Sequence, residues 1–156
     1  MALKVEVLQV PAQPTLSTRL RVPSRELGEK LSELLPAVFA YALNRGLGPG
    51  RPFVRYHGEE NDVLDVEAGV PVDAPGDGED DIRPGALPAC EVAVLLHEGA
   101  HQLLRSAHAD LAQWATENGK TSASGAWEVY ITDPADDPDP ASWKTKIYLP
   151  LRGNPG

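Results

Sequence analysis

The same order of predicted elements occurs twice along this chain of 156 residues, and this repetition limits the folds that it can adopt. Runs of alternating or continuous apolar residues predict strands at 3–10, 15–22, 52–57, 63–72, 89–97, 126–132 and 143–151. One amphipathic helix is predicted to begin at Ser24 and a second to follow Gly99. Each half, residues 3–75 and residues 88–152, therefore contains strand, helix, strand and strand. We expect an α+β fold in which two pseudo-symmetric modules form an antiparallel sheet with both helices on one side.

Individual residues predict where the first helix begins and where it is interrupted. Ser24 is expected to be its N-cap, because a serine hydroxyl accepts a hydrogen bond from an amide of the first turn. Apolar residues from Leu27 to Ala42 recur at helical spacing and form one stripe. Pro36 lies inside that stripe and should kink the helix or split it, since proline lacks an amide hydrogen.

The charge of the chain favours some partners over others. Fourteen Lys and Arg residues against 23 Asp and Glu residues give a net charge of −9. Because nucleic acid is itself densely negative, we expect no nucleic-acid partner, whereas a cationic small molecule would be attracted. Many of the acids lie in Gly- and Pro-rich segments at 73–81 and 133–139. Both segments are expected to be solvated loops, the first extending to about Pro88.

Nothing in the sequence indicates a membrane or a secreted protein. No apolar run approaches the roughly 20 residues that cross a bilayer, and no secretion signal precedes the first strand. Cys90 is the single cysteine, so it cannot form an internal disulfide. These features fit a reducing compartment, and we expect a cytoplasmic protein.

One motif suggests zinc but lies in the wrong context. His97, Glu98 and His101 match H-E-x-x-H, in which both histidines bind the metal from one face of a helix. Here the residues before His97 have strand character, and Gly99 is unfavourable inside a helix, by ~1 kcal/mol relative to alanine. We therefore expect a junction between a strand and a helix, and neither a metal nor another cofactor.

A carboxylate within an apolar strand is the main functional signal. On a strand over 126–132, Glu128 and Tyr130 face one way, and Trp127 and Val129 face the other. Burial makes such a carboxylate costly unless a partner compensates, and perturbed acids cluster at functional sites. The residues alone leave open whether Glu128 is such an acid or pairs with an Arg or Lys on a solvated sheet face.

Several segments together carry a resemblance to a known family. They are VEVLQVPAQPTLSTRL, the helix ending before LNRGLGPGRP, PFVRYHG, VEAGVPV, the HEG junction, WEVYITDP and WKTKIYLPL. These segments resemble the GyrI-like small-molecule-binding domains, which include effector-binding domains of AraC- and MerR-type regulators and stand-alone relatives. The resemblance covers nearly the whole chain and implies one domain over residues 1–156. Since the first strand begins near residue 3 and leaves no room for a helix-turn-helix, we expect a stand-alone domain.

The resemblance also implies a ligand site. In this family a cleft between the modules binds lipophilic, often cationic aromatic compounds around a central acid, and Glu128 matches the position of that acid. Tyr130 shares its face, and His97 would lie at the mouth. Further candidates, which fit a pocket wall or the core equally well, are Tyr56, Trp143, Phe39 and Tyr41. Aromatic rings would add cation–π attraction of roughly 0.5–2 kcal/mol per contact.

Three functions follow as hypotheses. The first is multidrug-type binding or sensing of hydrophobic cations. The second, suggested by stand-alone relatives that resemble hydrolases, is the opening of strained, electrophilic rings of cytotoxic natural products. Glu128 would then activate water, with Glu67 or Tyr130 as proton partner, so that the question of enzyme activity is open. The third is binding to DNA gyrase or to a regulator through the acidic surface.

Overall fold

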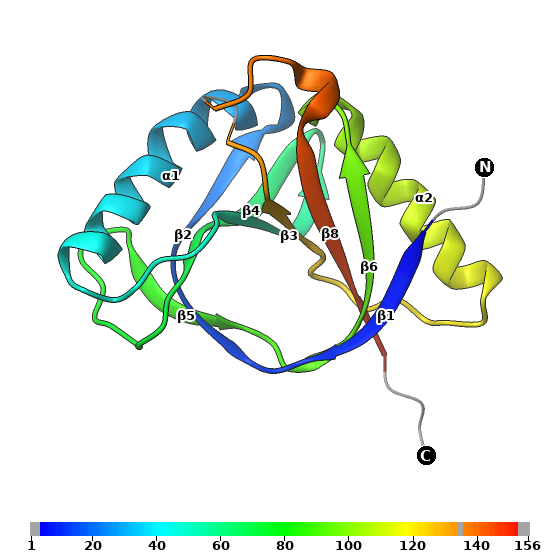
Figure 1. Cartoon of the computed structure of the whole chain (residues 1–156), viewed down its shortest axis with the longest axis horizontal. Helices are drawn as coiled ribbons and strands as arrows, with labels where there is room; N and C mark the ends of the chain where they lie inside the picture. Colours follow the sequence, from blue (N-terminus) through cyan, green and yellow to red (C-terminus); the bar gives the residue numbers. More distant parts are fainter. Residues whose placement is uncertain (1–3, 134–135, 153–156) are drawn as a thin grey trace. The chain divides into compact units, whose positions relative to one another are not determined.

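The computed structural model describes residues 4–133 and 136–152 and confirms the predicted α+β class (Figure 1). The chain forms two compact units. The N-terminal unit is Pro11–Ala89, and the C-terminal unit combines Met1–Val10 with Cys90–Gly156. Each unit contains one long helix and four antiparallel strands in its described residues. In this part of the chain neither helix has the length and apolar character needed to cross a membrane.

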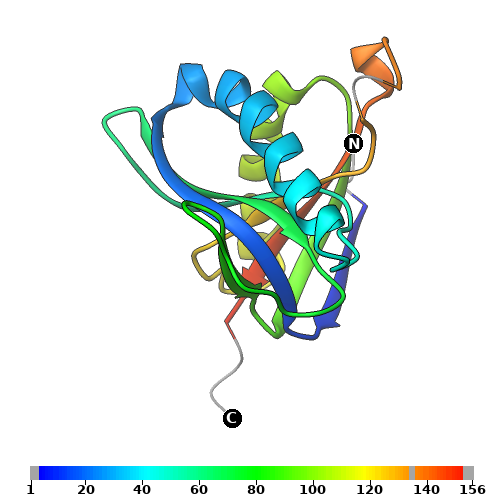
Figure 2. The same ribbon diagram turned by 90° about the vertical axis from the view of Figure 1, so that its left-hand side faces the viewer.

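The sheet of the N-terminal unit is built around strand β2 (Gln13–Pro23). One edge of β2 pairs with β4 (Val63–Pro71) and the other with β5 (Arg83–Leu87), while β3 (Phe53–Glu60) pairs with β4. Helix α1 (Leu27–Asn44) packs on β2 and β4 (Figure 2). The buried core between helix and sheet consists of Leu16, Val38, Ala42, Val70 and Val72.

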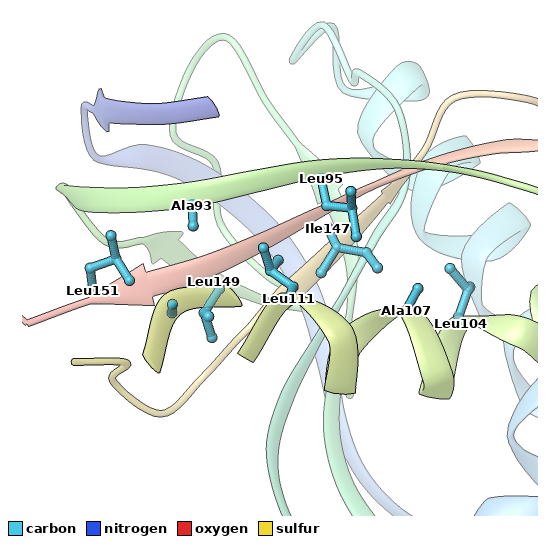
Figure 3. Packing of buried hydrophobic residues seen from close by; sticks show 9 residues of the cluster. Ala93, Leu95, Leu104, Ala107, Leu111, Ile147, Leu149 and Leu151 are labelled. Atoms are coloured by element: carbon cyan, nitrogen blue, oxygen red, sulfur yellow. The ribbon is translucent and has the colours of Figure 1, made fainter. Parts of the chain in front are cut away.

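The C-terminal unit has a matching sheet around β6 (Cys90–Glu98). Strand β6 pairs with β8 (Lys144–Leu151), and β8 pairs with β7 (Trp127–Tyr130). Strand β1 (Val5–Val10) pairs with the other edge of β6. Helix α2 (Leu104–Glu117) packs on β6 and β8. Figure 3 shows its core, which includes Ala93, Leu95, Leu104, Ala107, Leu111, Ile147, Leu149 and Leu151.

The two units share one strand order, which confirms the predicted repeat. In both, the strand before the helix pairs with the last strand of the repeat, and that strand also pairs with the one after the helix. An extra strand covers the remaining edge: β5 in the N-terminal unit and β1 in the C-terminal unit. The sequence assigned residues 3–10 to the first repeat, but β1 pairs with β6 of the second. Pairing between segments so distant in the chain leaves no trace in local periodicity.

The start of α1 differs from expectation, and of the two effects expected of Pro36 the split does not occur. Ser24 is not an N-cap: a 3-10 turn, Ser24–Glu26, precedes the helix, and no side chain caps either element. The helix is also not split, because α1 runs from Leu27 to Asn44 as one element. Val38 and Ala42, which follow the proline, are fully buried. Their packing holds the helix together across the missing hydrogen bond.

Strand β5 lies in the segment that was predicted to be a loop as far as Pro88. Pro84 and Gly85 have low strand propensity, so that the local sequence gave no signal. The strand forms because the edge of β2 offers backbone partners, from Gln13 opposite Leu87 to Ser17 opposite Arg83. Proline is tolerated here because β5 is an edge strand.

Candidate functional site

Glu128 lies in the middle of β7, and only 1% of its surface is exposed. It pairs across the sheet with Ile147, which in turn pairs with Leu95. Directly paired side chains project from the same face of a sheet, and Ile147 and Leu95 belong to the core packed against α2 (Figure 3). The carboxylate therefore completes an apolar row and does not lie on a solvated face. A carboxylate in this position requires polar partners.

Two side chains supply polar contacts. The hydroxyl of Tyr130 donates a hydrogen bond to Glu128 Oε2 at 2.6 Å, and His108 Nε2 lies 2.9 Å from Glu128 Oε1. The first distance is in the range of hydrogen bonds to charged oxygens. Tyr130 reaches the carboxylate because residues two apart on a strand share a face. His108 reaches it from α2, where it follows Leu104 by four positions and so faces the sheet.

A row of rings lies beside the carboxylate. The imidazole of His101 is flanked by Tyr130, with ring centroids 5.2 Å apart, and by Trp143, at 4.8 Å. The indole of Trp143 follows the short 3-10 turn Pro140–Ser142 and donates a 2.8 Å hydrogen bond to the Asp137 carbonyl oxygen, which fixes its orientation. All three rings are half-buried. They present aromatic surface next to a buried acid.

The electrostatics of His101 reflect this position. Burial lowers the pKa of His101 below its ordinary value of 6.5, the negative charge of Glu128 opposes this shift, and His97 adds to it. Burial therefore favours the neutral form of the His101 imidazole.

Three buried polar atoms at the site have no hydrogen-bond partner among the described residues: His97 Nε2, His101 Nε2 and Thr145 Oγ1. Thr145 pairs with both His97 and Tyr130 across the sheet, so these side chains share one row next to that of Glu128. Buried polar groups are normally satisfied by protein, water or a ligand. The three side chains of this paragraph can therefore form further hydrogen bonds, to water or to a ligand.

The H-E-x-x-H segment forms the expected junction. His97 and Glu98 end β6, Gly99 has a φ of +142°, and His101 begins a 3-10 turn, His101–Leu103. The two histidines thus lack the common helical face that the zinc motif requires. Within residues 4–133 and 136–152, no three His, Cys, Asp or Glu side chains gather as a group able to hold a metal ion.

The remaining predicted ligand contacts belong to the N-terminal unit. Tyr41 packs against the core of that unit, its hydroxyl donates to the Asp77 carbonyl oxygen at 3.0 Å, and Arg45 lies 4.8 Å above its ring. Phe39, on α1, is 38% exposed, and Tyr56 is half-buried on β3. Their role as ligand contacts stays a prediction.

Sequence reasoning missed His108 and gave His101 no role. A signal for His108 was present: with Leu104, Leu111 and Ala115 it falls on the core-facing stripe of the second helix. A histidine on an apolar stripe needs a polar partner, and Glu128 is the acid placed among apolar residues in the same half. His101 had no comparable signal, because its contacts depend on the turn that ends β6.

The family follows from comparison with known sequences. A profile of the GyrI-like small molecule binding domain matches residues 3–152. The chain belongs to this family. The GyrI-like domain thus accounts for nearly all of the sequence, in agreement with the resemblance seen in its motifs. A search of curated proteins found no match.

Among solved structures, this GyrI-like chain is similar to the C-terminal domain of EcmrR. The crystal structure of the EcmrR C-terminal domain has a TM-score of 0.85 and 27% identity, over 97% of this chain and 99% of that domain. EcmrR in a cryo-EM complex with DNA has a TM-score of 0.83 and 27% identity. The match covers 96% of this chain but 57% of that one, so this chain spans little more than half of EcmrR.

More distant structures share the fold alone. A hydrolase from Listeria innocua has a TM-score of 0.69 and 15% identity, over 96% of this chain and 92% of its own. SAV2435 bound to tetraphenylphosphonium has a TM-score of 0.61 and 12% identity, over 96% and 94% of the two chains.

Proposed function

We propose that this GyrI-like domain binds lipophilic cations that carry aromatic rings, and that Glu128 is the acid that selects them. The observation that carries the proposal is the burial of Glu128, at 1% exposure, beside half-buried rings. A multidrug-type binding or sensing role follows from recognition by charge and apolar area rather than by a specific pattern of hydrogen bonds.

The chemistry of the site suits such a ligand. A cation next to a desolvated carboxylate gains more than it would in water, because a low dielectric strengthens the attraction. The faces of Tyr130 and Trp143 offer cation–π contacts. A neutral aromatic molecule gains the apolar contacts but not the attraction to the charge. The fold relative SAV2435, bound to tetraphenylphosphonium, supports this ligand class.

We assign ligand contacts to Glu128, Tyr130, Trp143 and His97 in the C-terminal unit, and we add His101. Tyr56, Phe39 and Tyr41 of the N-terminal unit remain proposed contacts.

Calorimetric titration with tetraphenylphosphonium tests the proposal, with triphenylphosphine oxide as a neutral analogue. We expect saturable binding of the cation, much weaker binding of the oxide, and a loss of roughly tenfold or more in affinity for the cation in Glu128→Gln, equivalent to about 1.4 kcal/mol. Glu91→Gln is the matched control, since Glu91 lies on β6 of the same unit with 41% of its side chain exposed. Unchanged affinity in a folded Glu128→Gln protein would overturn the proposal.

A second candidate is hydrolysis of strained electrophilic rings, because Glu128 and the hydroxyl of Tyr130, 2.6 Å apart, could act as an acid–base pair. Glu128 would take a proton from water while the water oxygen bonds to a ring carbon and the strained ring bond at that carbon breaks. Tyr130 would donate its proton to the ring atom that keeps the electron pair of the broken bond, and Glu128 would return its proton to Tyr130. Glu67, the other partner considered, lies in the N-terminal unit, where it bonds to Ser17 and His57. Turnover of a cyclopropane-containing alkylating agent, lost in Glu128→Gln, would establish this activity. Stoichiometric binding without product would exclude it.

A further inference from the structure

Three of the four histidines of this chain lie at the site of the buried acid Glu128. His108 Nε2 is 2.9 Å from Glu128 Oε1, and the ring of His101 packs against Tyr130, whose hydroxyl bonds to Glu128 Oε2. His97 is close enough to His101 for its charge to act on that ring. A site that suits a cationic ligand thus contains three side chains that can themselves become cations.

His101 is the histidine that contacts the aromatic rings of the site. Its centroid lies 5.2 Å from that of Tyr130 and 4.8 Å from that of Trp143, with the ring planes tilted by 41° and 47°. A ligand that uses the faces of these two rings therefore lies close to the imidazole. His108 differs, because it contacts the carboxylate itself.

The charge of His101 decides what a ligand meets at the rings. Burial favours the neutral imidazole, and in that form no positive charge lies between the two rings and Glu128. In acid, a proton on His101 places a positive charge there, and the carboxylate of Glu128 stabilises it. Because like charges at short range disfavour one another, this charge opposes a cation bound beside it.

The titratable side chains next to His101 come from three elements of the C-terminal unit. They are Glu128 and Tyr130 on β7, His97 on β6 and His108 on α2. The negative charge of Glu128 favours a proton on His101, and a positive charge on His97 disfavours it. Glu128 is thus the counter-charge that His101 and a ligand share.

We propose that a proton on His101 and a bound lipophilic cation exclude one another, so that the domain binds its ligand at neutral pH and releases it in acid. This inference rests on the proposed function and adds a regulation of the same site. When the cation binds, the proton of His101 passes to solvent. By linkage, the proton weakens the binding of the cation as much as the cation weakens the binding of the proton.

Calorimetric titration with tetraphenylphosphonium between pH 8 and pH 5 tests the proposal, with circular dichroism to verify the fold at each pH. We expect Kd to rise as the pH falls, by at most about tenfold per pH unit, the limit for one proton. The ratio of Kd at pH 5 to Kd at pH 8 is then compared between proteins, so that a change in affinity common to both pH values cancels.

Two variants remove the proton site. His101→Phe keeps a ring between Tyr130 and Trp143, and His101→Gln keeps a polar side chain. We expect the ratio to be smaller in both by about threefold or more. His57→Gln is the matched control, because His57 lies in the N-terminal unit beside Glu67, and it should keep the ratio of the wild type.

NMR titration of the imidazole signals gives a readout without ligand. In Glu128→Gln the pKa of His101 should fall, because the negative charge that favours its proton is lost. Saturation of the wild type with tetraphenylphosphonium should lower the same pKa. An unchanged pKa in Glu128→Gln would mean that Glu128 is not the shared counter-charge, and it would overturn the proposal.

The outcomes separate this proposal from the proposed function. If the cation binds at pH 8 and Glu128→Gln weakens it, the proposed function stands. A Kd that does not change with pH, or an equal ratio in the wild type and in folded His101→Phe, then overturns the competition with the proton. A ratio kept in His101→Phe but lost in His108→Gln assigns the effect to His108 and also overturns it. Absence of binding at pH 8 overturns both proposals.

Discussion

The phenol of Tyr130 and the carboxylate of Glu128, two positions apart on β7, are joined by a hydrogen bond of 2.6 Å. The sequence predicted that these residues share a face, and this bond shows that they do. Tyr130 therefore has two roles: its ring contacts His101, and its hydroxyl stabilises the buried acid. Substitutions can separate these roles.

Tyr130→Phe should remove the hydrogen bond and keep the ring. Because the acceptor is charged and buried, we expect the free energy of unfolding to fall by about 1–3 kcal/mol, measured by urea denaturation. Tyr148→Phe on the neighbouring strand is the control, since Tyr148 stacks on Trp127 with ring centroids 5.4 Å apart and its ring would be retained. Equal effects of the two substitutions would argue against a special role for the Tyr130 hydroxyl.

His108 should act by positioning the acid. His108→Ala removes the group 2.9 Å from Glu128 Oε1, and we expect a loss of stability of about 1–3 kcal/mol together with weaker binding of tetraphenylphosphonium. His108→Gln retains an N–H donor and should restore part of both. A purely steric role for His108 would instead predict that Gln and a similarly sized Leu rescue equally well.

The lowered pKa of His101 predicts a dependence of stability on pH. Burial disfavours the charged imidazole, so the unfolded chain binds a proton more readily than the folded one. The stabilising contribution of neutral His101 is thus complete above the ordinary pKa of 6.5 and is lost as the pH falls through the folded-state value. Urea denaturation between pH 7.5 and pH 5 should show a decrease in unfolding free energy that is smaller in His101→Phe. An identical pH profile in both proteins would contradict this assignment.

Gly99 should be intolerant of any side chain. Its φ of +142° is unfavourable for other residues, and an added Cβ would lie 3.3 Å from His97 Nε2. We expect Gly99→Ala to cost about 1–3 kcal/mol of stability and to displace the His97 ring. Gly119→Ala shares a positive φ, +70°, but meets open space, so it should cost only about 1 kcal/mol. Thermal unfolding of both variants then separates the cost of the positive φ, which both share, from the cost of the contact with His97, which only Gly99→Ala makes.

The sequence was informative where a local pattern determines the structure. Periodicity identified both helices, and the position of an acid between apolar neighbours drew attention to Glu128, which is buried in the structure. It was uninformative where the tertiary context decides. Strand β5 contains Pro84 and Gly85 and forms only because β2 has an edge to pair with.

At the candidate site, too, some contacts follow from local strand geometry and others from tertiary packing. The face shared by Glu128 and Tyr130 follows from strand geometry alone. The contact of Glu128 with His108 depends on how α2 is rotated against the sheet, and that rotation is set by packing at Leu104 and Leu111. The ring row depends on the turn at His101 and on the carbonyl group that holds Trp143.

The pairing of β1 with β6 has a consequence for biosynthesis. Val5 pairs with Leu95, ninety positions further along the chain, so the first strand leaves the ribosome long before its partner exists. Meanwhile residues Pro11–Ala89 already contain every strand of their own sheet. Co-translational folding should therefore start within residues 11–89, and the first strand should dock later, once β6 has been translated and released from the ribosome.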